Sequence, residues 1–183
     1  DWDAAGQVRA EAARGLEAAG AGVMMIAANT MHIVADQVRD ATALPFIHIA
    51  DATADAIAAS GLKRPGLIAT AFTMEMPFYR DRLEAAGLAP VIPDASARPE
   101  IHRIIFDELC RNEIREDSRH FYEQVASDLI AEGADCIILG CTEVGLLLSA
   151  DNARGFPASL MRADRPSWRK ISIERVLTTS SLG

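Results

Sequence analysis

The chain lacks several features that mark common protein classes. Its 183 residues carry a net charge of −8, so they lack the positive charge on which most nucleic-acid-binding surfaces depend. No run of 18 apolar residues occurs, so no transmembrane helix is expected. The first residues show neither the basic nor the apolar segment of a secretory signal peptide. We therefore expect a cytoplasmic protein that binds neither nucleic acid nor membrane.

Cysteine motifs and phosphate-binding loops are also missing. There are three cysteines and no Cys-x-x-Cys pair, which argues against a disulfide framework and against a structural zinc site. Reduced thiols fit a cytosolic protein. Neither G-x-G-x-x-G nor G-x-x-x-x-G-K-[ST] occurs, and no spacing of histidines and carboxylates suggests a metal site. The sequence thus predicts no metal and no dinucleotide cofactor.

Apolar residues, by contrast, make up half of the chain. Segments with a helical spacing of apolar residues alternate with short unbroken apolar runs. Short unbroken apolar runs predict strands, of which residues 23–26 and 135–139 should be buried on both faces. Gly20 should end the first helix. Asp51 should cap the helix expected over residues 52–60. This alternation predicts an α/β fold with parallel sheets and helices on both faces. The expected helices are 4–19, one through Val34 and Val38, 52–60, 73–86, 101–110 and 118–131, and the expected strands are 23–26, 45–49, 66–70, 90–93 and 135–139.

One internal repeat, at an offset of 113 residues, places residues 16–30 over residues 129–143. Each copy reads as a helix end, a Gly-Ala turn, a strand and a small polar loop, which predicts two pseudo-symmetric lobes. Ligands in such folds bind beyond the carboxyl ends of the parallel strands. The loops 28–30 and 141–143 should therefore face each other across an active site between the lobes.

The expected lobes divide the chain into three parts. Residues 1–49 form an incomplete first lobe, and residues 50–150 form the second lobe. Residues 151–183 carry six basic and three acidic side chains, and we expect them to be an atypical basic C-terminal tail.

Cys141 follows a predicted strand and precedes a predicted helix. A helix N-terminus would lower the pKa of its thiol, so Cys141 could accept a proton, donate one or act as a nucleophile. Cys110 and Cys136 lie within a predicted helix and strand and are expected to be buried structural residues. We therefore expect Cys141 alone to be alkylated quickly.

Short polar side chains surround the two loops of the repeat. Asn29, Thr30 and Thr142 offer polar groups and backbone N–H donors at helix starts, which suit a carboxylate or simply cap the helices. Thr70 and Thr73 follow a third strand and could add hydroxyl contacts, with helix capping by Thr73 as the alternative.

Two titratable groups, His32 and Glu143, lie in or just beyond the same loops. Either could tune a thiol or a substrate amine. A histidine at such a place is more often a surface residue or a hydrogen-bonded one, so His32 is expected in a supporting position, with a direct role as the alternative.

These segments resemble the aspartate/glutamate racemase family, whose amino-acid racemases need no pyridoxal phosphate. The resemblance runs from about Trp2 to about Ser149 and implies two α/β lobes with the active site between them. It also implies two opposed acid/base groups at the substrate Cα, a small amino-acid substrate, no cofactor and a homodimer. The matching segments are residues 28–32 (Ala-Asn-Thr-Met-His), 48–53, 70–75 with Phe78 and Tyr79, and 140–143 (Gly-Cys-Thr-Glu).

Three departures from that family affect the expected activity. Position 28 is usually Cys, or Thr in one branch, whereas Ala28 carries no transferable proton. The strand and Gly-rich loop with which the family begins are not seen, and the basic tail matches nothing in the family. We therefore expect a racemase with impaired activity in which Cys141 is the remaining acid/base. The alternatives are a catalytically inactive binding or assembly protein of the same fold, or a one-thiol decarboxylase or isomerase of a small dicarboxylic acid.

Overall fold

Two separate parallel sheets organise residues 1–148, the part of the chain that the computed structural model describes. In the first, β1 (Met24–Met25) pairs with β2 (Phe46–Ile47). In the second, β3 (Pro65–Ile68) pairs with β4 (Cys136–Leu139). The two strands of the internal repeat, β1 and β4, thus belong to different sheets.

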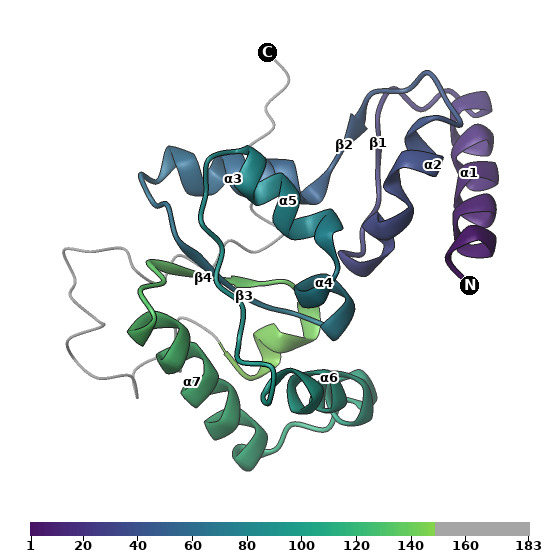
Figure 1. Ribbon diagram of the computed structural model, residues 1–183. Coiled ribbons are helices and arrows are strands. Elements are labelled where there is room, and N and C mark those ends of the chain that lie inside the picture. Colours follow the sequence, from purple (N-terminus) through teal and green to yellow (C-terminus); the bar gives the residue numbers. More distant parts are fainter. Residues whose placement is uncertain (149–183) are drawn as a thin grey trace.

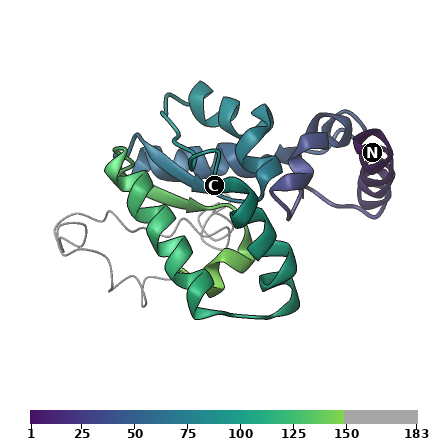
Figure 2. The same ribbon diagram turned by 60° about the horizontal axis from the view of Figure 1, so that its bottom comes forward.

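Helices surround the two sheets differently. Figure 1 shows α1 and α2 beside the β1–β2 sheet, while α3 and α5 lie on one side of the β3–β4 sheet and α6 and α7 on the other. Figure 2 shows the same layers from a second direction. This arrangement confirms the α/β class with parallel sheets. The helices are α1 (Trp2–Ala18), α2 (Ala35–Arg39), α3 (Ile49–Ala59), α4 (Ala71–Glu75), α5 (Pro77–Ala85), α6 (Arg98–Asp107) and α7 (Glu116–Ala131), with 3-10 helices η1 (Thr30–Val34), η2 (Leu109–Arg111) and η3 (Thr142–Leu146).

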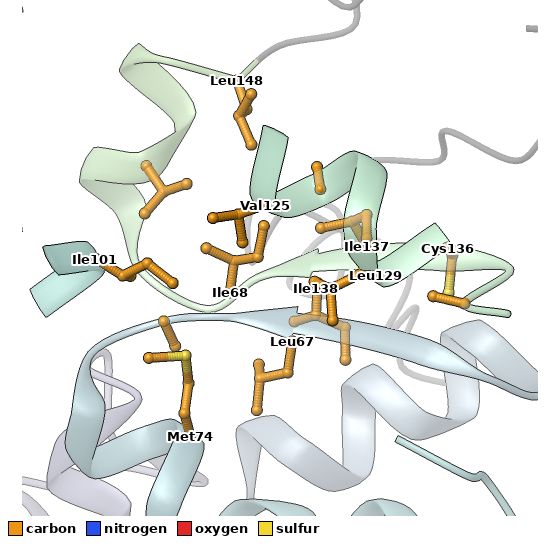
Figure 3. Packing of buried hydrophobic residues seen from close by; sticks show 14 of the residues in the cluster. Leu67, Ile68, Met74, Ile101, Val125, Leu129, Cys136, Ile137, Ile138 and Leu148 are labelled. Atoms are coloured by element: carbon orange, nitrogen blue, oxygen red, sulfur yellow. The ribbon is translucent and has the colours of Figure 1, made fainter. Parts of the chain in front are cut away.

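The larger hydrophobic core lies on both faces of the β3–β4 sheet. Side chains alternate along β3, so Leu67 and Ile68 point to opposite faces, and Ile101 and Val125 share the side of Ile68 (Figure 3). All four side chains are at most 5% exposed. The predicted strand 90–93 is reduced to one parallel bridge between Val91 and Gly66. This core is what holds the carboxyl ends of β3 and β4 side by side.

Local chemistry explains where two predicted helix boundaries were wrong. The helix expected over 73–86 is two helices, α4 and α5, because Pro77 lacks an N–H group and forces Met76 into an extended conformation. The helix that was expected to begin after Asp51 begins earlier, at Ile49, and its cap is His48. Asp51 instead forms an ion pair with Arg82, at 2.7 Å between Oδ2 and Nη1.

The strand expected to be buried on both faces at residues 23–26 is buried on one face only, so this prediction was wrong. Met24 points into a small core with Ala13, Val34 and Val38. Val23 is 52% exposed and Met25 is 39% exposed. Val23 and Met25 therefore lie outside this small core.

Three further expectations concern the end of α1, the basic segment and membrane-spanning helices. Gly20 follows α1 with a φ of +88°, a left-handed conformation that favours glycine, as predicted for the end of this helix. The predicted basic segment 151–183 lies outside the described residues. None of the described helices is long and apolar enough to cross a bilayer.

Candidate functional site

A pocket of about 190 Å³ lies where the two loops of the internal repeat meet. Its wall contains residues that follow β1, β3 and β4, in agreement with the expectation that ligands bind beyond the carboxyl ends of parallel strands. The structure thus brings together seven of the nine residues that the sequence singled out. The lining residues are Ala27, Ala28, Asn29, Thr30, Thr70, Gly140, Cys141, Thr142 and Glu143.

Asn29 links the two loops directly. Its Nδ2 donates a hydrogen bond to the carbonyl oxygen of Gly140 at 2.9 Å, which assigns the orientation of the amide because a carbonyl only accepts. The oxygen of the same amide, Oδ1, is buried and has no hydrogen-bond partner within residues 1–148. Asn29 as a whole is 6% exposed. An unsatisfied buried acceptor is costly, so this atom is suited to a donor from a ligand.

Gly140 allows the residue that follows β4 to lie close against the end of β3. A Cβ atom built on Gly140 would lie 2.8 Å from the Cβ of Ala69 and 3.2 Å from Cδ1 of Leu67. Its backbone N–H donates to the carbonyl oxygen of Ile68 at 2.8 Å. Gly140 and Ala27 line the pocket but were not expected as site residues, although the repeat places these two positions over each other.

Three threonine hydroxyls form a closed triangle beside the pocket. The oxygen of Thr30 lies 3.0 Å from that of Thr70 and 3.3 Å from that of Thr73, and the last two are 3.2 Å apart. Thr30 and Thr70 line the pocket, whereas Thr73 is fully buried behind them. Thr70, rather than Thr73, caps α4, because its hydroxyl accepts from the backbone N–H of Thr73.

The pKa of Cys141 moves in the direction opposite to the one expected. Burial and the neighbouring Glu143 raise the pKa of its thiol to about 12. The thiol donates to Oε2 of Glu143 at 2.9 Å, and the hydroxyl of Thr142 donates to the same oxygen at 2.7 Å. These hydrogen bonds, the one from Cys141 first, hold the pKa of Glu143 below its ordinary value. The prediction of a lowered thiol pKa was wrong because a buried site next to a carboxylate disfavours a second negative charge.

His32 lies behind the pocket rather than in its wall. It is 2% exposed, and its ring contacts the carbonyl oxygen of Ala28 through Nδ1 at 3.0 Å. Burial lowers its pKa, so the ring is neutral at physiological pH. The edge of the His48 ring lies against it at 4.4 Å between centroids.

The two other cysteines differ from each other. Cys136 is buried in β4, as expected, and burial raises its pKa to about 12. Cys110 is exposed, so the expectation that it is buried was wrong. The helix predicted to contain it ends at Asp107, and Cys110 lies in the following 3-10 helix, η2.

This geometry changes the expected order of alkylation. At pH 8 we expect iodoacetamide to label Cys110 first, Cys141 later and Cys136 last, because Cys110 is exposed and Cys141 is half-buried with a pKa raised to about 12. Burial and Glu143 raise the pKa of Cys110 as well, so exposure decides its place in the order. Labelling of Cys141 should rise about tenfold per pH unit up to its pKa, since the thiolate is the reactive form. Mass mapping of peptides after timed quenching would measure both effects.

The variant Glu143→Gln provides the control for this prediction. It removes the negative charge next to the thiol, so it should speed labelling of Cys141 and leave Cys136 protected. Labelling of Cys141 ahead of Cys110 in the unaltered chain would contradict the assignment of a protonated, half-buried thiol.

Comparison with known proteins agrees with the resemblance seen in the sequence. The model of a family described as Asp/Glu/Hydantoin racemase matches residues 1–159. A glutamate racemase from Hydrogenobaculum sp. (strain Y04AAS1) is 29% identical over 127 residues, which are 68% of this chain and 47% of that protein. The chain therefore spans about half the length of this relative.

Solved structures show the same fold. A candidate Asp/Glu racemase from Yersinia pestis is 46% identical, with a TM-score of 0.79 over 84% of this chain and 67% of the other. An aspartate racemase homologue from Pyrococcus horikoshii is 28% identical, with a TM-score of 0.78 over 97% of this chain and 75% of the other. Because the family model covers most of the sequence, the chain belongs to the Asp/Glu/Hydantoin racemase family.

Proposed function

We propose that the chain binds a small amino acid such as aspartate or glutamate in the pocket and that Cys141 transfers the proton of its Cα. The observation that carries this proposal is that one pocket is lined by both loops of the internal repeat and has the Cys141 thiol in its wall. By family resemblance we also propose that the reaction needs no pyridoxal phosphate, and that the protein acts as a homodimer in the cytoplasm.

The polar groups of the pocket suit the two charged ends of an amino acid. The unpaired Oδ1 of Asn29 and the carboxylate of Glu143 are acceptors for the substrate ammonium. The hydroxyls of Thr30, Thr70 and Thr142 line the pocket, and each can donate to its carboxylate by turning away from its present hydrogen bond. Thr73 lacks access to the pocket, so we propose that it orients Thr30 and Thr70 instead of contacting the substrate.

The raised pKa of Cys141 sets the order of events. Without substrate the thiol keeps its proton and shares it with Glu143 in a hydrogen bond. An ammonium bound beside Glu143 would offset the negative charge of the carboxylate and make the thiolate easier to form. The thiol then loses its proton to solvent, the thiolate removes the Cα proton as a general base, and the resulting thiol returns a proton as a general acid. Hydrogen bonds to the substrate carboxylate stabilise the carbanion-like transition state.

Ala28 limits this reaction to one face of the substrate. The repeat places Ala28 at the position equivalent to Cys141, and its methyl group carries no proton. We therefore propose exchange of the Cα proton mainly with retention of configuration, with slow inversion in which water replaces the second acid/base.

Deuterated water tests this proposal. The chain is incubated with L-aspartate or L-glutamate, deuterium at Cα is measured by NMR, and the enantiomers are separated by chiral chromatography. Deuterium with retention, accompanied by a slow loss of optical purity, is the expected result. Binding of the amino acid without any exchange would overturn the proposal and would favour an inactive binding protein.

Ala28 also favours one second candidate, a one-thiol decarboxylase or isomerase acting on a small dicarboxylic acid. Such chemistry needs a single proton donor, which is what Cys141 supplies when position 28 is alanine. Turnover of a dicarboxylic acid with no exchange at the Cα of any amino acid would support this candidate.

A further inference from the structure

The hydrogen bonds of His32 define both the tautomer and the orientation of its ring. The backbone N–H of Ile49 donates to Nε2 at 3.3 Å, so Nε2 carries no proton. Nδ1 therefore carries the proton of the neutral ring and donates it to the carbonyl oxygen of Ala28 at 3.0 Å. With both nitrogen atoms engaged, the ring is a bridge between two backbone groups.

The His32 ring joins the loop of residues 28–30 to the start of α3. Ile49 is the first residue of α3 and belongs to the larger hydrophobic core. Ala28 lies in the pocket wall, and its carbonyl oxygen also accepts from the backbone N–H of Met31 at 3.2 Å. A carbonyl with two donors in place has a defined orientation, so the backbone at position 28 is held relative to α3.

Other side chains hold the neighbouring loop residues, whereas residue 28 has, besides His32, the backbone hydrogen bond from Met31. Asn29 is bonded to Gly140, and Thr30 is bonded to Thr70 and Thr73. The side chain of Ala28 is a methyl group and is exposed, so it anchors nothing. The ring of His32 is therefore the side chain that anchors position 28.

We propose that His32 is a positioning residue that sets the place of the position-28 side chain relative to the substrate Cα, by bridging the Ala28 carbonyl and the Ile49 N–H. This inference rests on the proposed function, because it assigns to position 28 the second face of the same substrate. It concerns the geometry of that face and requires no proton transfer by His32 itself.

Two substitutions of His32 each keep only one of its two hydrogen bonds, either the one to Ala28 or the one from Ile49. The amide nitrogen of asparagine reaches the place of Nδ1, so His32→Asn can still donate to the Ala28 carbonyl. The amide oxygen of glutamine reaches the place of Nε2, so His32→Gln can still accept from Ile49 but loses the bond to Ala28. Both variants remove the imidazole ring from the same buried site, so their free energies of unfolding provide a direct check that they are matched.

The experiment combines each substitution with Ala28→Cys, which gives position 28 an acid/base group. We expect His32→Gln to lower inversion about 10- to 100-fold, since a displacement of about 1 Å can cost 10²-fold, and to spare exchange with retention. His32→Asn should stay within about threefold of the Ala28→Cys variant. His48→Asn is the control, because asparagine can still cap α3 at Ala50 and His48 has no bond to Ala28. Equal loss of inversion in the Asn and Gln variants, or no loss in either, would overturn the proposal.

A second measurement keeps this inference separate from the proposed function. The alkylation rate of the thiol introduced at position 28 reports its placement without any turnover. A several-fold difference between His32→Gln and His32→Asn, with no Cα exchange in any variant, would support the positioning by His32 and contradict the proposed function. Identical alkylation rates in the two variants would contradict the positioning.

Discussion

Replacing Cys141 with alanine is expected to reduce deuterium exchange at the substrate Cα by about 10²–10⁴-fold, the usual contribution of a general acid/base group. The thiol lies in the wall of the pocket, and the proposed reaction depends on its proton. Substrate binding should change little, because the polar groups of Asn29 and of the threonines remain. The measurement is the exchange rate at saturating substrate, together with an affinity from calorimetry.

Two matched variants make this result interpretable. Cys110→Ala removes an exposed thiol outside the pocket and should leave exchange unchanged. Cys141→Ser keeps a hydroxyl that can donate to Glu143, but a hydroxyl ionises far less readily than a thiol, so exchange should still fall steeply. Full exchange in a folded Cys141→Ala protein would remove Cys141 from the reaction.

Replacing Ala28 with cysteine is expected to raise inversion by about 10²–10⁴-fold, because it adds the acid/base group that the second face of the substrate lacks. The gain should appear in kcat more than in KM, since a proton carrier acts in the transition state. Ala28 is exposed in the pocket wall, so the added sulfur atom meets the pocket rather than the core. Chiral chromatography at saturating substrate measures the effect.

Ala27→Cys is the control for this variant. Ala27 is the preceding residue, is also exposed and also lines the pocket, so it introduces a thiol at nearly the same place with a different direction. It should not reproduce the gain in inversion. An unchanged inversion rate in a folded, substrate-binding Ala28→Cys protein would show that position 28 does not reach the substrate Cα.

The order and type of the elements could be predicted from the sequence because they depend on neighbouring residues. Apolar runs produced β3 and β4, and Gly20 ended α1 as expected. The boundaries failed where one residue carries two competing signals. Asp51 reads as a helix cap but pairs with Arg82, and Pro77 breaks a pattern that is otherwise helical.

The pocket could be anticipated because the repeat equates two loops and parallel strands end at the same edge of a sheet. The different positions of the threonines relative to the pocket could not be predicted in this way. Thr70 and Thr73 are three residues apart at the start of α4, yet Thr70 lines the pocket and Thr73 is fully buried. Both hydroxyls contact that of Thr30, which is 40 residues or more away in the sequence, so their arrangement exists only in the folded chain.

By itself the sequence determined the α/β class, the family resemblance, the two loops that meet and the presence of a thiol in one of them. Only the tertiary structure decided the chemical state of that thiol, because a pKa depends on burial and on the distance to other charges. A helix start in the sequence suggested an acidic thiol, whereas burial and the hydrogen bond to Glu143 make Cys141 a poor acid. In the same way the sequence showed a histidine near the loop, and the fold brought Ala28 and Ile49 to its two nitrogen atoms. Hydrogen bonds between residues far apart in the chain form only when the core has packed, and a pattern of neighbouring residues does not record them.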